Sequence, residues 1–183
     1  MKKGLHITCL LTLATLFAAC GDTPVIELPT DKSGEVKEHM INANRVVIQS
    51  ENTQIEQYLQ RRKWNTSPLP CGASCMIDNP GQGPLVNPDD TVVVQYRLEA
   101  LDGSAFYTRQ RDTLVVGRRH ATVALDDLLQ QMHYGGQAWL VAPSNSAYGV
   151  VGDGDRVPSR TVIVYHVTEV APFHSQPMKN NKQ

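Results

Sequence analysis

The sequence predicts an α+β domain in which an antiparallel β-sheet covers one short helix. Two segments, residues 91–100 and 161–170, are rich in β-branched residues and alternate in polarity, as strands with one buried face do. Between them, residues 122–132 carry apolar side chains at helical spacing. Several strands with a single helix indicate a sheet that packs one face on that helix.

Length and composition fit one domain with appendages. The chain has 183 residues, of which 41% are hydrophobic and 19% are charged, so it can build a folded core. Its 17 Lys and Arg residues nearly balance its 18 Asp and Glu residues, and the net charge is -1 without a long basic run. Binding of nucleic acid through charge is therefore not expected.

The first 20 residues resemble the export signal of bacterial lipoproteins. Lys2 and Lys3 precede an apolar run, residues 7–19, that is too short to span a bilayer, and Cys20 follows small residues. Acylation of such a cysteine with two or more chains anchors a protein stably to a membrane. An ordinary secretory signal cleaved near Ala19 is the alternative. In some bacterial lipoproteins an aspartate directly after the cysteine favours retention in the inner membrane, and this chain has Gly21 at that place. We therefore expect a lipid-anchored protein of the cell envelope, in the outer membrane and facing the periplasm.

Two cysteines, Cys71 and Cys75, remain for pairing in the mature chain. If both lie on one extended strand, their Cα atoms stand about 13 Å apart, beyond the ~7 Å that a disulfide spans. Pro70 and Gly72 disfavour a helix that would bring them closer. We expect these thiols to stay free or to pair between chains, and their spacing does not indicate a metal site.

A long helix is predicted upstream of the sheet. From residue 36 to about residue 64 the chain has no Pro or Gly, and Pro68 and Pro70 are expected to end the helix. Its apolar residues recur at spacings compatible with one stripe. They are Val36, Met40, Val47, Ile48, Ile55, Tyr58 and Leu59. The stripe can pack on the same domain or on a second copy of the chain.

Turn chemistry divides the rest of the chain. Asp102 and Gly103 form a hairpin signal between predicted strands over residues 91–100 and 105–116. Thr122 can cap the short helix, and Gly135 is expected to end it. Two further strands are predicted over residues 137–143 and 161–170, separated by a loop.

Common catalytic motifs do not account for this sequence. The six histidines show no metal-ligand spacing, and the chain has no nucleophile elbow, Walker loop or dinucleotide-binding glycine pattern. Residues 132–149, MHYGGQAWLVAPSNSAYG, instead resemble the signature of the FKBP-type peptidyl-prolyl cis-trans isomerases. Residues 92–106 and 157–170 are similar to the first long strand, its hairpin and the final strand of that family. The upstream helix ending in YLQRRKW is similar to that of FKBP-like lipoproteins of the Bacteroidota.

The resemblance implies both a fold and a site. Family members wrap a twisted antiparallel sheet of five to six strands around one short helix, and an apolar pocket between them binds proline. Carried over by position, the catalytic pocket residues are Tyr96, Phe106, Thr122, Leu125, Tyr148, Val157 and Tyr165, with Tyr107 and Ala121 at the rim. The Thr122 backbone N–H and the Tyr148 hydroxyl would hold carbonyls of a proline-containing polypeptide. The family mechanism requires no cofactor and no metal.

Three positions depart from the family pattern. Leu125 stands where active members carry the tryptophan floor of the pocket, Tyr107 replaces an aspartate, and Asp112 replaces an aromatic residue at the rim. The smaller floor implies weaker binding of proline. Two functions therefore stay open: an isomerase that assists folding of exported proteins, and a non-catalytic lipoprotein that binds proline-containing segments as a holdase. The sequence does not set the clients or the oligomeric state.

These inferences divide the chain into five parts. They are a lipoprotein signal peptide (residues 1–19), a tether (20–35), an N-terminal helix (36–66), an FKBP-like domain (67–171) and a polar tail (172–183).

Overall fold

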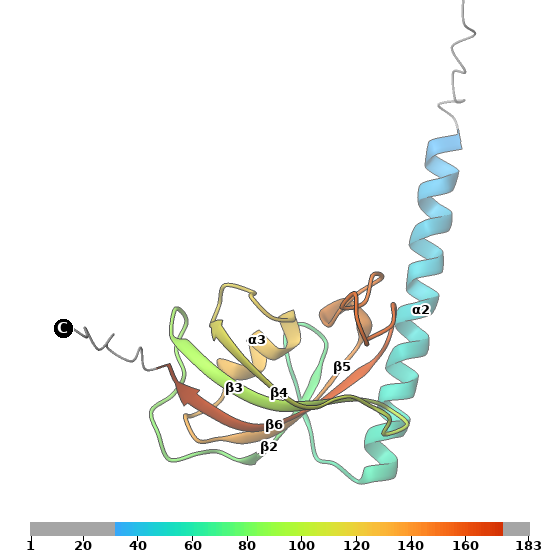
Figure 1. Ribbon diagram of the computed structural model, residues 1–183. Helices are drawn as coiled ribbons and strands as arrows, with labels where there is room; N and C mark the ends of the chain where they lie inside the picture. The colour runs from blue at the N-terminus through green and yellow to red at the C-terminus, as the bar shows by residue number, and fades with distance from the viewer. Residues whose placement is uncertain (1–31, 174–183) are drawn as a thin grey trace, which may run out of the picture. The chain divides into compact units, whose positions relative to one another are not determined.

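The computed structural model describes residues 32–173 (Figure 1). The elements are α2 (Lys32–Arg62), β1 (Ser67–Pro68), β2 (Ser74–Asn79), β3 (Thr91–Ala100), β4 (Ala105–Val115), α3 (Val123–Leu129), β5 (Gln137–Ala142), the 3-10 turn η1 (Ser144–Ser146) and β6 (Ile163–Pro172). The predicted signal peptide, Cys20, and most of the tether and the tail lie outside the described residues. Within residues 32–173, no helix combines the length and the apolar character needed to cross a membrane.

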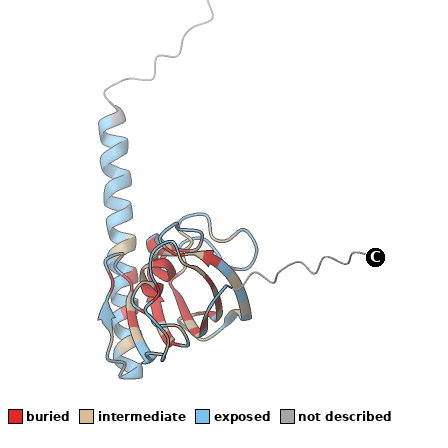
Figure 2. Cartoon of the chain, turned by 90° about the vertical axis from the view of Figure 1, so that its left-hand side faces the viewer, coloured by how far each residue is buried: buried red, intermediate tan, exposed pale blue. Residues whose placement is uncertain are grey.

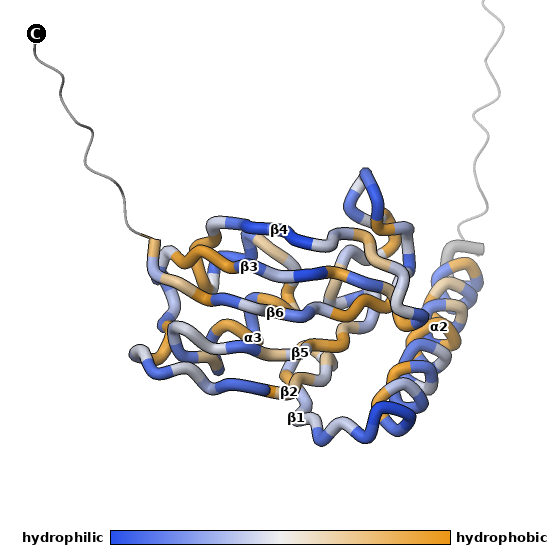
Figure 3. The backbone as a smooth tube through the Cα atoms, turned by 60° about the horizontal axis from the view of Figure 1, so that its bottom comes forward, coloured by the Kyte–Doolittle hydropathy of each residue, from blue (hydrophilic) through white to orange (hydrophobic). Residues whose placement is uncertain are grey.

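The strands of the described region form one antiparallel sheet of order β1-β2-β5-β6-β3-β4. Figure 3 shows the longer strands side by side in this order. The first and last pairs in this order, β1–β2 and β3–β4, are hairpins of sequence neighbours, and β5 and β6 lie between them. The predicted α+β class, with an antiparallel sheet of five to six strands, one short helix and an extra N-terminal helix, is confirmed.

Local turn chemistry sets the β3–β4 hairpin as predicted. The Asp102 carboxylate accepts hydrogen bonds from the Ser104 N–H at 2.8 Å and from its hydroxyl at 2.6 Å. Gly103 has a φ of 88°, a left-handed conformation that glycine adopts without strain. Strand β3 has the predicted bounds, and β4 ends one residue earlier than predicted.

The short helix α3 begins where its cap predicts. Thr122 is the N-cap, and its hydroxyl oxygen accepts a hydrogen bond from the Leu125 N–H at 3.4 Å. The expectation that Gly135 ends this helix is wrong, because α3 ends at Leu129 and Gln130 caps it. Gly135, with a φ of 79°, instead lies in the turn that leads into β5.

The sheet is buried on both faces at the end where β5 and β6 pair. Along β5, Leu140 joins the core that contains α3, whereas the next residue, Val141, faces the opposite side. There it packs with Val164 of β6 and with Ile55 and Tyr58 of α2. Figure 2 shows the buried residues concentrated in the sheet and α3. The part of α2 that belongs to the same compact unit as the sheet, from Ala43 onward, therefore packs on its own domain.

Two expectations about the upstream helix need correction. Only the C-terminal part of the predicted stripe is buried, because Val36 and Met40 are exposed. The helix ends at Arg62 rather than at the prolines. Lys63 adopts a φ of 56°, and the Trp64 N–H donates to the Leu59 carbonyl at 3.2 Å, which closes the helix end several residues before Pro68.

Cys71 and Cys75 are free thiols, in line with the prediction, but the premise of one extended strand is wrong. Cys71 lies in the turn between β1 and β2, where the Leu69 N–H donates to the Ala73 carbonyl at 2.8 Å. Cys75 lies on β2 opposite Ser67. Burial raises the pKa of both thiols, which disfavours the reactive thiolate.

Candidate active site

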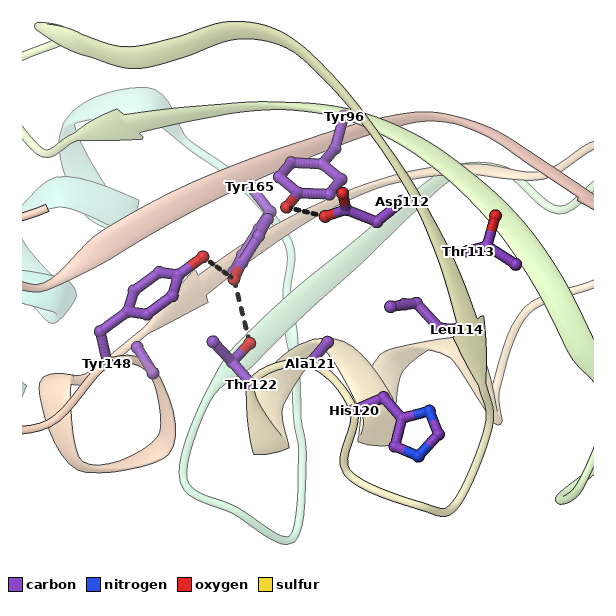
Figure 4. A pocket seen from close by; sticks show the side chains of 10 residues that line it. Tyr96, Asp112, Thr113, Leu114, His120, Ala121, Thr122, Tyr148 and Tyr165 are labelled. Carbon is purple, nitrogen blue, oxygen red and sulfur yellow. Dashed lines mark hydrogen bonds between the residues drawn. The ribbon is translucent and has the colours of Figure 1, made fainter. Parts of the chain in front are cut away.

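A pocket of about 510 Å³ opens on the side of the sheet that faces α3 (Figure 4). Its size falls within the range of small-ligand sites, about 300 to 1,000 Å³. The lining residues come from β3, β4, β6, the loop before α3 and the segment after β5. They are Tyr96, Asp112, Thr113, Leu114, His120, Ala121, Thr122, Ala147, Tyr148 and Tyr165. Five of the residues predicted from the family resemblance are therefore brought together: Tyr96, Ala121, Thr122, Tyr148 and Tyr165.

Strand alternation places the two aromatic side chains at the back of the pocket. Tyr96 on β3 and Tyr165 on β6 both point toward α3 because each occupies an inward position of its strand. Their ring centroids lie 5.2 Å apart with an interplanar angle of 69°, an edge-to-face arrangement that aromatic rings favour. The rings thus form a fixed apolar surface inside the pocket.

A chain of hydroxyl groups crosses the pocket to Tyr148. The Tyr165 hydroxyl donates to the Tyr148 hydroxyl at 3.4 Å, and it lies 3.0 Å from the Thr122 hydroxyl. Because Tyr165 has one hydroxyl proton and gives it to Tyr148, Thr122 must be the donor in the second contact. The Tyr148 proton then remains available for a ligand. Hydrogen bonds linked in this way polarise one another and strengthen the last donor.

The Thr122 backbone N–H is a second available donor. This N–H precedes α3 and makes no hydrogen bond within residues 32–173. Burial raises the pKa of Tyr148 and of Tyr165, so both hydroxyls keep their protons at neutral pH. The pocket therefore offers two neutral hydrogen-bond donors to the carbonyl groups of a ligand.

Asp112 makes one side of the pocket polar. Its Oδ2 accepts a hydrogen bond from the Tyr96 hydroxyl at 2.6 Å, and its Oδ1 accepts one from the Gln110 side chain at 3.1 Å. Burial and this contact with Asp112 raise the pKa of Tyr96. Among the described residues, none of the ion pairs involves Asp112. On this side the pocket departs from an apolar box as the sequence indicated, because a half-buried carboxylate takes the place of an aromatic ring.

Four predicted site residues lie beside the pocket rather than on its lining. Leu125 is 1% exposed and belongs to the core with Val157, and Phe106 packs half-buried against that core. Tyr107 packs half-buried against the same core, and its hydroxyl donates to the Asp153 carboxylate at 2.6 Å. Tyr107 thus anchors the loop that follows Tyr148 instead of forming the rim.

The Asp153 carboxylate organises that loop from within. Its Oδ1 accepts hydrogen bonds from the backbone N–H groups of Asp155, Arg156 and Val157 at 2.8 to 2.9 Å. Burial alone would raise the pKa of Asp153, but these bonds and the one from Tyr107 together lower it.

The pocket also contains residues that the sequence reasoning did not select. Thr113 and Leu114 belong to β4, and Ala147 belongs to the Ala-Tyr-Gly part of the motif already noted. His120 lies on the loop before α3, at the opposite end of the pocket from Tyr148 (Figure 4). Nothing in its sequence spacing indicates this position. Its ring is exposed to solvent.

Comparisons with known proteins agree with this architecture. Residues 83–169 match the sequence model of a family described as FKBP-type peptidyl-prolyl cis-trans isomerase. No protein with curated annotation matches the chain.

Solved structures with the same fold include a peptidyl-prolyl cis-trans isomerase from Pseudomonas syringae. It is 25% identical, with a TM-score of 0.57, and the match covers 69% of this chain and 95% of that one. AtFKBP13 is 20% identical with a TM-score of 0.54, covering 60% of this chain and 100% of its own. The N-terminal domain of FKBP42 from Arabidopsis thaliana is 23% identical with a TM-score of 0.53, covering 61% and 94%. The sequence match over residues 83–169 and the shared fold together support an FKBP-type peptidyl-prolyl cis-trans isomerase domain in this part of the chain.

Proposed function

We propose that this protein catalyses cis-trans isomerisation of peptide bonds that precede proline. The observation that supports it best is the open pocket in which the Tyr148 hydroxyl and the Thr122 N–H are both free to donate. Substrates are proline-containing polypeptides, in agreement with the family whose sequence model residues 83–169 match. Because this pocket is open, its lining residues are not merely the packed core of a domain that has lost its binding site.

The chemistry asks for positioning rather than for a nucleophile. Rotation about the bond before proline has a barrier of about 20 kcal/mol because it breaks the amide resonance. The twisted amide is less dipolar than the planar one, so the apolar rings of Tyr96 and Tyr165 favour it relative to water. Donors that hold the flanking carbonyls restrict the bound peptide to conformations close to the twisted state. No covalent intermediate is formed in this scheme.

The second candidate is a binding module that holds proline-containing segments without turning them over. It is favoured by the absence of an aromatic floor, because Leu125 is buried in the core and offers no flat surface to the pocket. A protease-free isomerisation assay on a peptide with one proline separates the two functions. Catalysis above the uncatalysed rate supports the isomerase. Peptide binding, seen in tyrosine or tryptophan fluorescence, without catalysis supports the module.

We also propose that the protein acts at the bacterial cell envelope on exported proteins, anchored through lipid on Cys20. The apolar run that ends in small residues before Cys20 supports this location. Labelling of the cells with a fatty acid tests it. We expect label in the wild type and none in Cys20→Ala, and label that persists in Cys20→Ala would contradict the anchor.

A further inference from the structure

We infer that Glu51, on the upstream helix α2, is a positioning residue that fixes the segment carrying Tyr148. The inference rests on the proposed function, in which Tyr148 donates to the substrate. Glu51 is 5% exposed, and it is one of the few charged side chains buried in the described region. A buried carboxylate is costly unless it is hydrogen-bonded, so its partners show what it is there to hold.

Both oxygens of Glu51 contact a single residue at the end of β5. Oε2 accepts a hydrogen bond from the Ser144 backbone N–H at 2.9 Å, and Oε1 accepts one from the Ser144 hydroxyl at 2.6 Å. Ser144 begins the 3-10 turn η1, and the residue before it, Pro143, supplies no side-chain cap. Glu51 therefore caps this turn from a distant helix through two charge-assisted hydrogen bonds.

The backbone carbonyl of Ser144 forms hydrogen bonds with both sequence neighbours of Tyr148. The Ser144 carbonyl accepts hydrogen bonds from the Ala147 N–H at 3.1 Å and from the Gly149 N–H at 2.7 Å. Tyr148 lies between these two anchored residues, and Ala147 itself lines the pocket. The position of the Tyr148 hydroxyl relative to Tyr165 thus depends on Ser144, and Ser144 depends on Glu51.

Helix α2 keeps Glu51 in place because the helix itself packs on the sheet near this residue. One turn further along α2, Ile55 is buried, and Tyr58 is 2% exposed. Both pack with Val141 and Val164 on the outer face of the sheet. This face and the pocket lie on opposite sides of the same strands, so the helix supports the pocket by packing on the reverse face of the sheet.

Amide hydrogen exchange at Ala147 and Gly149 tests this role without relying on catalysis. Glu51→Leu removes both acceptor oxygens, Glu51→Gln keeps one of them, and Glu56→Gln is the matched control, since Glu56 is exposed on the same helix. Hydrogen bonds to a charged group are strong enough that we expect exchange at both amides to become roughly 10- to 100-fold faster in Glu51→Leu. Exchange in Glu51→Gln should stay within a few-fold of the wild type, and Glu56→Gln should have no effect.

Isomerase kinetics on the same variants give the second readout. The value of kcat/KM should fall in Glu51→Leu, with the larger part of the change in kcat, and Glu51→Gln should restore most of it. If Glu51→Leu fails to fold, Ser144→Ala removes only the hydroxyl contact and should still speed exchange several-fold at the same amides.

The outcomes separate the two proposals. Unchanged exchange at Ala147 and Gly149 in folded Glu51→Leu, or in Ser144→Ala, overturns the positioning role. The same effect in Glu56→Gln would also overturn it, because the response would not be specific to this contact. If exchange responds as expected while the wild type shows no isomerase activity, the proposed function fails and the positioning role stands.

Discussion

Replacing Tyr148 with phenylalanine removes one hydroxyl from the pocket and leaves the ring in place. In the structure this hydroxyl accepts from Tyr165 at 3.4 Å and has its own proton free for the substrate. A neutral hydrogen bond contributes about 0.5 to 1.5 kcal/mol. We therefore expect kcat/KM to fall by a factor of roughly 2 to 12. The fold should tolerate the change, because the Tyr165 hydroxyl can turn its proton to Thr122, which lies 3.0 Å away.

The assay is a protease-free isomerisation measurement on a proline peptide, accompanied by thermal melts. Tyr134→Phe is the matched control, because Tyr134 is also half-buried and its hydroxyl donates to Asp90 at 3.1 Å outside the pocket. The control should keep its kcat/KM. If Tyr148→Phe is folded and matches the wild type, or if Tyr134→Phe loses as much, the donor role of Tyr148 is refuted.

Three further predictions concern charge, pH and packing. The Asp112 carboxylate in the pocket should favour a lysine over a neutral glutamine beside the proline by about fivefold, from a Coulomb energy of about 1 kcal/mol at 4 Å in water. Asp112→Asn should abolish this ratio of kcat/KM, and equal turnover of both peptides by the wild type would contradict the prediction. His166 stacks on Trp139 with centroids 3.9 Å apart, and burial lowers its pKa from 6.5. The unfolded chain therefore binds this proton first, so the stability present above pH 6.5 should decline as the pH falls through the folded pKa, and melts of His166→Phe should lack that decline. Leu125→Trp should lower the free energy of unfolding by about 1 to 3 kcal/mol, because Leu125 is 1% exposed in the core; an unchanged denaturant midpoint would show that the site has room.

The features that sequence could predict depend on residues close together in the chain. The Asp102-Gly103 turn and the Thr122 cap involve bonds across two or three positions, so the residue types alone indicate them. Strand alternation also predicts that Tyr96 and Tyr165 share one face of the sheet, given that the two strands pair. The family resemblance then brings them together with Tyr148.

The features that sequence could not predict depend on distant contacts. Glu51 and Ser144 are 93 residues apart, and nothing near either of them indicates the other. The Lys63 left-handed conformation closes α2 before its prolines, although lysine is not a residue that marks such an end. Leu98 and Glu99 are successive residues of β3 and both are buried, because Leu98 joins the core that contains α3 while Glu99 pairs with Val164, which packs on the outer face that α2 covers.

The stretch of chain that matches the family is shorter than the unit that packs together. Residues 83–169 leave out β2, which pairs with β5, and α2, which covers Val141 and Val164. A fragment cut to these limits would expose an unpaired strand edge and an apolar sheet face, two features that promote aggregation. Transplanting or expressing the family segment alone should therefore yield an insoluble product, whereas a fragment that begins near residue 43 keeps both covers. For this chain, the segment that matches the family and the compact unit of the structure have different limits.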